Sequence, residues 1–344
     1  MSLVSAGFAD VVGKLTSLRD WELARVLFGE YWCRAVSDHV EGIASRLFAA
    51  AGALAERSHD SVRLLMEGLL EAGISVFHVG SSRPTSGSEH LVSHYVEMRR
   101  FNEGGRPPAH GHVVGFGMLV IAELAEKMRG LRAEDVRKTR FTPADMEQVL
   151  AELRLDEVPG NFGKSKFDAE IRDARLPVIA SRWDDILAVL EKVPPAHKIR
   201  EGLARVGAPT NLRDLGLDPE TAMDTVLHAR YMRERYTMLD LAAELGVLEA
   251  QAANIVRKYA EEGSAGCTWE GAHVEAMGSK RFKCALGIDF GTLSARAVVV
   301  DVATGRELGT ATCPYASGVI TERLPGTDVA LPPGFALQDP LDYL

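Results

Sequence analysis

Four of the ten histidines in this 344-residue chain fall between His90 and His112, and their spacing indicates a metal site. His90 and His94 are four residues apart, which on a helix places both imidazoles on one face. His110 follows a Pro-Pro-Ala break at the start of the next apolar run, so a second helix can return it toward the first. Two imidazoles and one carboxylate leave a coordination position open for water or substrate, as catalytic metal sites do.

An acid for such a site is available at Asp10, which stands among apolar residues at a predicted helix start. Because a buried carboxylate is costly unless it is paired or bound to a metal, Asp10 is the candidate third ligand. Ordinary alternatives stay open: Asp10 also fits a helix N-cap or first-turn acid. The histidine pair also fits hydrogen-bonded or solvent-facing positions on an amphipathic helix. His112 is expected to point away from the site.

The elements that must position these residues are predicted to be helices through about residue 262. Apolar residues recur at three- and four-residue steps from Leu15 to Phe28, and Val113 to Ala122 predicts one buried helix. Ser58 is a candidate helix N-cap and Gly73 a candidate stop, with the apolar run 73–79 ambiguous. Further helices are predicted at residues 89–102, 111–128, 143–153, 166–190, 198–206, 218–233, 238–245 and 248–262.

The composition excludes several classes of protein. A formal net charge of −9 opposes nucleic-acid binding, which needs a basic face, while 46% hydrophobic and 25% charged residues are typical of a globular protein. No apolar stretch approaches the ~18 residues of a membrane span, and no leader peptide opens the sequence. The four cysteines are too scattered for a disulfide framework. We therefore expect a reduced, cytoplasmic protein without nucleic-acid or membrane partners, and a homo-oligomer stays open.

The sequence changes character near residue 262. Glycines without an apolar period follow, which predicts a linker, and β-branched runs at 284–290 and 295–302 predict strands. A turn at 303–306 precedes a third predicted strand. The predicted domains are a helical part (1–262), a linker (263–283) and a small β-rich part (284–344).

Three blocks of the helical part carry a family resemblance: AGFADVVGKLTSLRDWELARVLFGE, GSSRPTSGSEHLVSHYVEM and HGHVVGFGML. They resemble the C-terminal half of sn-glycerol-1-phosphate dehydrogenases, in the superfamily of iron-type alcohol dehydrogenases, glycerol dehydrogenase and dehydroquinate synthase. The likeness reaches about residue 250 through VGAPTNLRDLGL and RERYTMLDLAAELG. It implies a mainly α fold, a multihelical dehydroquinate synthase-like C-terminal domain.

The resemblance also implies roles for particular residues. The metal ligands of that family correspond to three positions: Asp10, His90 and His110. His94 resembles the catalytic histidine that lines the substrate site and relays protons. The metal would be zinc, nickel or iron, acting as a Lewis acid on the C2 oxygen of a three-carbon phosphate while hydride passes to or from NAD(P). Arg83 and Lys14 are candidate ligands of the substrate phosphate, although either also fits a surface salt bridge.

In such dehydrogenases a nucleotide-binding domain precedes the acidic ligand, which here is only the tenth residue. No glycine-rich βαβ turn comes before it, so the sequence predicts no turnover by this chain alone unless a separate subunit supplies that domain. A dehydroquinate synthase-like activity is less favoured, because SEHLVSH departs from the glycine-histidine pattern of that enzyme.

The C-terminal strings GIDFGTLSARAVVVDVATG and LPGTDVALPPGFALQDPLDYL resemble the beginning of an L-ribulokinase of the FGGY carbohydrate-kinase family. That resemblance implies an incomplete fragment of an actin-like (ribonuclease H-like) kinase domain at 285–344. Asp289, Gly291 and Thr292 would belong to its ATP-phosphate and magnesium site, although the same residues fit an ordinary β-hairpin turn. Because most of both kinase lobes is lacking, no kinase activity is predicted.

The sequence is therefore compatible with three functions. The favoured one is the metal-binding half of a dehydrogenase that acts on a phosphorylated three-carbon substrate. The second is an L-ribulokinase-type kinase fragment, and the third is a non-catalytic fusion remnant. The simplest explanation of the two resemblances is a fragment of a longer fusion, or of two adjacent reading frames, that joins a sugar-phosphate dehydrogenase to a sugar kinase.

Overall fold

The computed structural model describes residues 3–135, 147–149, 151, 169–261, 284–290, 294–302, 304–314, 319–320, 330 and 337–338. The chain divides into two compact units, Leu3–Cys267 and Thr268–Leu344, and each is described by itself. The predicted linker at 263–283 lies outside the described residues, as do Gly291 and Thr292.

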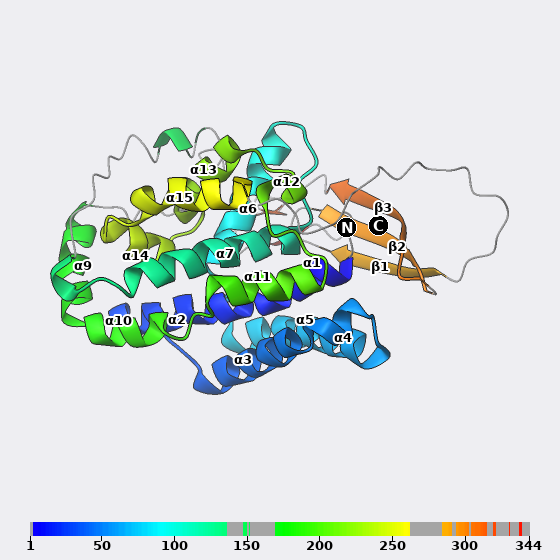
Figure 1. Cartoon of the computed structure of the whole chain (residues 1–344), viewed down its shortest axis with the longest axis horizontal. Coiled ribbons are helices and arrows are strands. Elements are labelled where there is room, and N and C mark those ends of the chain that lie inside the picture. The colour runs from blue at the N-terminus through cyan, green and yellow to red at the C-terminus, as the bar shows by residue number, and fades with distance from the viewer. Residues whose placement is uncertain are drawn as a thin grey trace. The chain divides into compact units, whose positions relative to one another are not determined.

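The first unit is helical, which confirms the predicted mainly α class (Figure 1). Its α-helices are α1 (Leu3–Val12), α2 (Lys14–Phe28), α3 (Arg34–Ala49), α4 (Ala51–Ala55), α5 (His59–Val79), α6 (Ser88–Asn102), α7 (His110–Met128), α9 (Ala169–Ser181), α10 (Trp183–Leu190), α11 (Ala196–Arg205), α12 (Leu212–Leu215), α13 (Pro219–His228), α14 (Met238–Glu244) and α15 (Leu248–Glu261). Within the part of the chain that the structure describes, 3₁₀ turns lie at η1 (Ala133–Asp135) and η3 (Ala229–Met232). None of the described helices combines the length and apolar character needed to cross a membrane.

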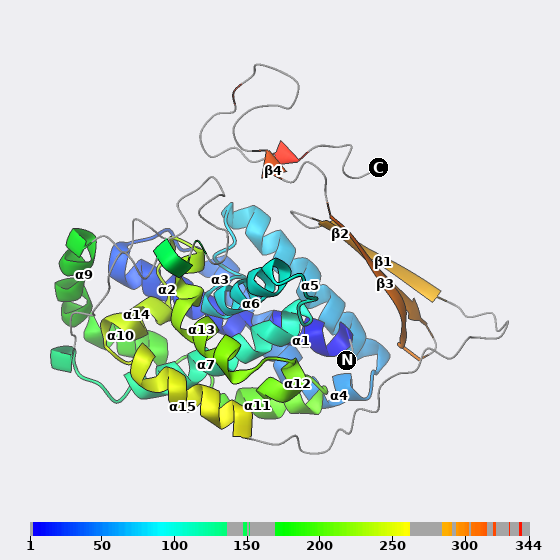
Figure 2. The same ribbon diagram turned by 90° about the horizontal axis from the view of Figure 1, so that it is seen from above.

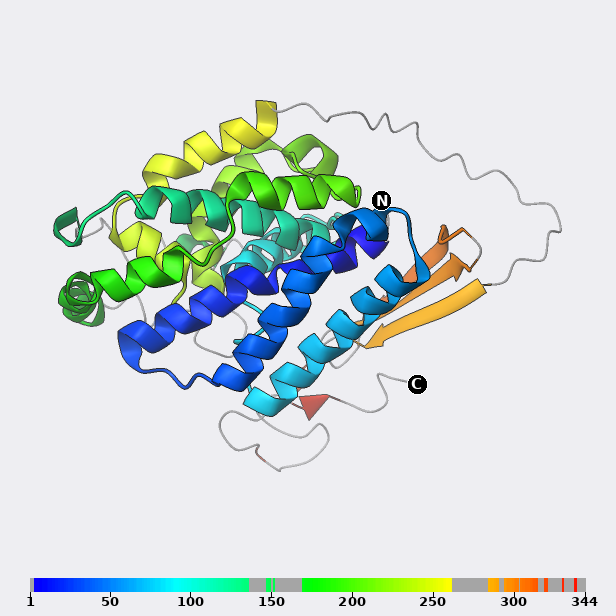
Figure 3. The same cartoon turned by 60° about the horizontal axis from the view of Figure 1, so that its bottom comes forward.

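Helix α7 runs through the middle of this unit (Figures 1 and 2). Every residue from Gly111 to Ala122 is buried, which confirms the predicted buried helix. It packs against α1 and α6, while α3 and α5 cover the other side of α1 (Figure 3). Burial on all sides from Gly111 to Ala122 explains why this stretch is apolar all round instead of on one stripe.

Glycines allow the helices of this centre to approach closely. A Cβ on Gly111 would lie 2.0 Å from the Ala6 carbonyl oxygen of α1, and one on Gly117 would lie 2.6 Å from the Glu89 carbonyl oxygen of α6. Because backbone cannot move aside as a side chain can, these two positions require glycine. The same contacts bring Ala6 of α1 and the start of α6 beside α7.

Several helix ends differ from the predicted ones. Helix α5 continues through Gly73 and ends at Gly80, whose φ of +70° is the left-handed conformation that glycine adopts readily. The run predicted at 166–190 is two helices, α9 and α10, which separate at Arg182. Asp10 lies in the last turn of α1 and not at a helix start. The predicted cap is confirmed at Ser58, whose side chain accepts the Ser61 N–H.

The second unit contains a three-stranded antiparallel meander in the order β1-β2-β3 (Figure 1). Its strands are β1 (Cys284–Phe290), β2 (Ser294–Asp301) and β3 (Glu307–Pro314), and a separate pair joins β4 (Val319–Ile320) to β5 (Leu337–Gln338). The three predicted strands are confirmed. Asp289, expected on the turn, instead lies within β1 opposite Arg296, because the ladder continues to Phe290 and Ala295.

Candidate metal centre

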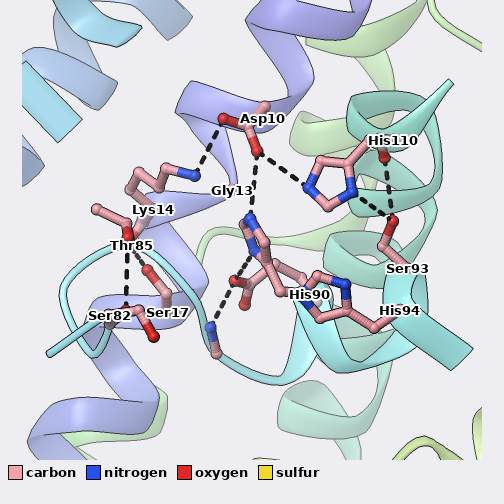
Figure 4. A network of polar contacts seen from close by, with 12 residues as sticks. Asp10, Gly13, Lys14, Ser17, Ser82, Thr85, His90, Ser93, His94 and His110 are labelled. Atoms are coloured by element: carbon pink, nitrogen blue, oxygen red, sulfur yellow. Dashed lines mark hydrogen bonds and ion pairs between the residues drawn. The ribbon is translucent and has the colours of Figure 1, made fainter. Parts of the chain in front are cut away.

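Three helices bring Asp10, His90 and His110 together (Figure 4). One ligand atom from each of these side chains lies within 4.8 Å of the others. Asp10 comes from the end of α1, His90 from the first turn of α6 and His110 from the first residue of α7. The predicted convergence of these three residues is therefore present in the geometry, and their service as metal ligands stays a prediction.

The spacing of the ligand atoms suits a tetrahedral ion. The Nε2 atoms of His90 and His110 lie 3.2 and 3.7 Å from Oδ1 of Asp10. With metal–ligand bonds of about 2.0–2.2 Å, two ligand atoms of a tetrahedral site are about 3.3–3.6 Å apart. The two distances to Asp10 lie within about 0.1 Å of this range, and all three ligand atoms lie within 4.8 Å of one another.

Carboxylates hold the other nitrogen of both histidines. Nδ1 of His90 donates to Glu89 at 2.7 Å, and Nδ1 of His110 donates to Glu97 at 2.6 Å. Metal-binding histidines commonly donate their second ring N–H to a carboxylate, which sets the tautomer and leaves the free nitrogen toward the ion. Both Nε2 atoms therefore remain available to coordinate.

Glu89 and Glu97 were missed by sequence reasoning, although a local signal was present. Glu97 follows His90 by seven residues, or two helical turns, which places it on the histidine face of α6, whereas Glu89 is the direct neighbour of His90 in the chain. Glu89 is fully buried and also accepts hydrogen bonds from the Thr16 hydroxyl and the Gly87 N–H. These bonds fix its carboxylate from three sides.

The charges of the centre favour a cation. Three carboxylates, those of Asp10, Glu89 and Glu97, accompany the single ammonium of Lys14, whose Nζ lies 3.2 Å from Oδ2 of Asp10. Burial opposes ionisation of Asp10, yet Lys14 and His90 hold its pKa well below the usual range. An excess of ionised acids is unfavourable by itself, above all for Asp10 at the C-terminal end of α1, and a divalent ion would compensate it.

His94 lies next to the cluster without belonging to the Asp10 group. Its ring centroid is 6.1 Å from that of His90 and 5.6 Å from that of His110, and its Nδ1 is 3.5 Å from Glu97. Burial lowers the pKa of His94, although Glu97 acts in the opposite direction. A neutral imidazole beside the proposed metal could exchange a proton with a bound oxygen, so its predicted relay role stays a prediction.

The two predicted phosphate ligands lie in different surroundings. Lys14 belongs to the centre through Asp10. Arg83 instead forms a two-pronged ion pair with Glu30, with Nε to Oε1 at 2.6 Å, and donates to the Tyr236 carbonyl oxygen. His112 lies outside the cluster as expected, since its Nε2 is 2.9 Å from the Ser5 hydroxyl and burial lowers its pKa to about 4.

Fold and site together define a helical domain with a two-histidine, one-carboxylate cluster. In comparisons with known proteins, this chain is similar to part of several dehydrogenases. A glycerol-1-phosphate dehydrogenase (NAD(P)+) of Bacillus licheniformis is 27% identical over 247 residues, 72% of this chain and 51% of its own. The enzyme of the same name from Halalkalibacterium halodurans is 31% identical over 209 residues, 58% of this chain and 50% of its own. The enzyme of the same name from Thermococcus kodakarensis is 27% identical over 237 residues, 69% of this chain and 47% of its own.

The chain therefore spans about half the length of the curated relatives it matches. No family model matches the sequence.

Proposed function

We propose that this chain is the metal-binding half of a dehydrogenase that interconverts dihydroxyacetone phosphate and glycerol 1-phosphate with NAD(P). Relatives named glycerol-1-phosphate dehydrogenase support a dehydrogenase-type function. The single observation that carries the proposal is the pair of histidines whose Nδ1 atoms are held by carboxylates and whose Nε2 atoms converge on Asp10. A structural pair of histidines would not need this arrangement.

Nitrogen and oxygen ligands of this kind suit zinc, nickel or iron, which leaves the identity of the metal open. A divalent ion held there supplies Lewis acidity to a carbonyl or alkoxide oxygen. The chain's own residues would then orient the reacting oxygen: Lys14 adds positive charge beside Asp10, and His94 accepts or returns a proton. Lys14 and Arg83 remain the proposed ligands of the substrate phosphate.

Hydride transfer requires a nicotinamide cofactor, which the printed name of the relatives includes. The cofactor is proposed to bind to a nucleotide-binding part equivalent to the half of the relatives that this chain does not span. Without such a part, these residues are not expected to turn over substrate. The ribulokinase resemblance of residues 285–344 stays a prediction.

Metal analysis of the purified chain, prepared with zinc or nickel supplied, tests the proposal. About one divalent ion per chain is expected. His90→Ala and His110→Ala each remove one of the two nitrogen ligands and should lose the ion, whereas His59→Ala, an exposed histidine outside the cluster, should keep it. Absence of metal from the parent chain under both supplies would overturn the proposal.

Thermal shift then tests the substrate class, because a ligand that binds the folded state raises the melting temperature. Dihydroxyacetone phosphate should raise the melting temperature of the metal-loaded parent and not that of His110→Ala. Metal binding with no response to this phosphate or to NAD(P)H would favour the non-catalytic remnant instead.

A further inference from the structure

A second site is suggested by a cavity of about 530 Å³ at the C-terminal end of α2. Its described walls come from three other places: Arg83 before α6, α9, and the segment that precedes α14. Its volume lies within the range of small-molecule sites. Phe28 and Ile171 at its wall are about half exposed, so the cavity opens to solvent.

Three arginines line this cavity, namely Arg83, Arg175 and Arg235. Arg83 and Arg175 are each more than nine-tenths buried, and each is oriented by an acid, Glu30 and Glu244 respectively. Guanidinium groups held in place by such pairs lose little further freedom when they bind a ligand.

Arg235 is anchored by the loop that leads to the metal centre. Its Nη1 donates to the Ser86 carbonyl oxygen at 2.8 Å, and its Nη2 donates to the Ser82 hydroxyl at 2.9 Å. Burial, together with the nearby charges of Arg83 and Arg233, lowers the pKa of Arg235 to about 10. Positive charge from Arg83 and Arg233 therefore lies near Arg235, although Glu30 and Glu89 offset part of it, and an added anion would relieve the remaining repulsion.

Apolar surface completes the cavity. Phe28 and Tyr236 lie edge to face with ring centroids 5.1 Å apart, and the Arg175 guanidinium lies over the Tyr236 ring at 5.0 Å. Val178 of α9 adds an aliphatic side chain to the wall. A charged end and an apolar body can thus be accommodated together.

We propose that this cavity binds a small organic oxyanion whose charged end contacts Arg235 and whose apolar body packs against Phe28 and Tyr236. Glu30 and Glu244 neutralise Arg83 and Arg175, whereas Arg235 donates hydrogen bonds to the neutral oxygens of Ser82 and Ser86. None of the described residues that line the cavity belongs to the Asp10 cluster, although Arg83 is also a proposed ligand of the substrate phosphate, so Arg235 is the residue that distinguishes this site.

Calorimetric titration with three ligands of one shape tests the inference: phenyl phosphate, benzoate and phenol. The two anions should bind at least about tenfold more tightly than neutral phenol, because oxyanions form charge-assisted bonds with arginine. Preference between the anions separates a phosphate site from a carboxylate site. Equal binding of all three ligands, or no binding, would overturn the proposal.

Variants locate the binding. Arg235→Gln should weaken binding of the preferred anion at least about tenfold, while Arg182→Gln, at the junction of α9 and α10 and absent from the cavity wall, should leave it unchanged. His110→Ala should also leave it unchanged, and loss of binding in that variant would assign the anion to the metal centre. If Arg235→Gln does not fold, the parent protein provides the test. A rising salt concentration must weaken binding of the two anions and leave binding of phenol unchanged.

Discussion

The helices around α7 and the strands of the second unit bury their side chains very differently. Residues from Val113 to Ala122 are nearly inaccessible to solvent, whereas Asp301 is the one buried side chain among those the structure describes in β1 to β3. Packing against neighbours on all sides determines where α7 lies, while β1 to β3 are joined by a regular backbone ladder. A site that needs ligands within tenths of an ångström therefore belongs in the first region.

The largest expected difference concerns a glycine in each region. Gly111→Ala places a methyl group 2.0 Å from the Ala6 carbonyl oxygen, so the free energy of unfolding should fall by about 3 kcal/mol or more. Gly309→Ala in β3 meets nothing within 4 Å and should change it by less than about 1 kcal/mol. Chemical denaturation measures both. Equal effects would show that the contact between α1 and α7 is not closely packed.

Shortening an aliphatic side chain should also reduce stability more in the helical region than in the strands. Leu119→Ala in α7 empties a fully buried position and should cost about 3 kcal/mol, whereas Val299→Ala in β2, only partly buried, should cost about 1 kcal/mol or less. Denaturant midpoints of the two variants against the parent provide the test. A larger loss of stability in Val299→Ala than in Leu119→Ala would contradict the closer packing of the helical region.

Asp20, a buried acid of α2, should make the stability of the helical unit depend on pH. Burial and the Glu89 charge raise the pKa of Asp20 from 3.8 to about 7, although Asp20 accepts the N–H groups of Ser88 and Met238. Its contribution to stability should therefore decline as pH rises from about 4 to about 7, since the folded state binds more protons over that range.

Asp20→Asn removes this pH dependence and replaces one of the two carboxylate oxygens that accept backbone N–H groups. The free energy of unfolding should therefore fall by about 1–3 kcal/mol at low pH. The gap in melting temperature between this variant and the parent should narrow as pH rises. A gap that is constant or widens over that range would contradict the assigned burial of the charge.

The smallest expected effect concerns the carboxylate behind His110. Glu97→Gln keeps an acceptor for Nδ1 and loses the charge, so metal affinity should fall about tenfold, or about 1.4 kcal/mol. Competition with a chelator measures the affinity. The exposed Glu103→Gln at the end of α6 serves as the matched control and should leave it unchanged.

Local sequence was sufficient for most helices and for the histidine pair. Periodicity predicted α2, α6 and α7 within one residue at each end, because the pattern of apolar residues directly reflects which face is buried. It was wrong at Gly73, where glycine is tolerated inside a helix whose surroundings leave space, and Gly80 supplies the stop. A glycine within a helix and a glycine that ends one look alike until the chain's path is known.

The chain by itself specified which residue types could bind a metal and that His90 and His94 share a helix face. Only the tertiary structure showed that the rings of His90 and His110 are held by Glu89 and Glu97, and that His94, placed outside the ligand set by resemblance, lies beside the Asp10 group. It also paired Arg83 with Glu30, more than fifty residues away. Helical periodicity is a property of neighbouring residues, whereas partners distant in sequence meet only through the packing of whole helices.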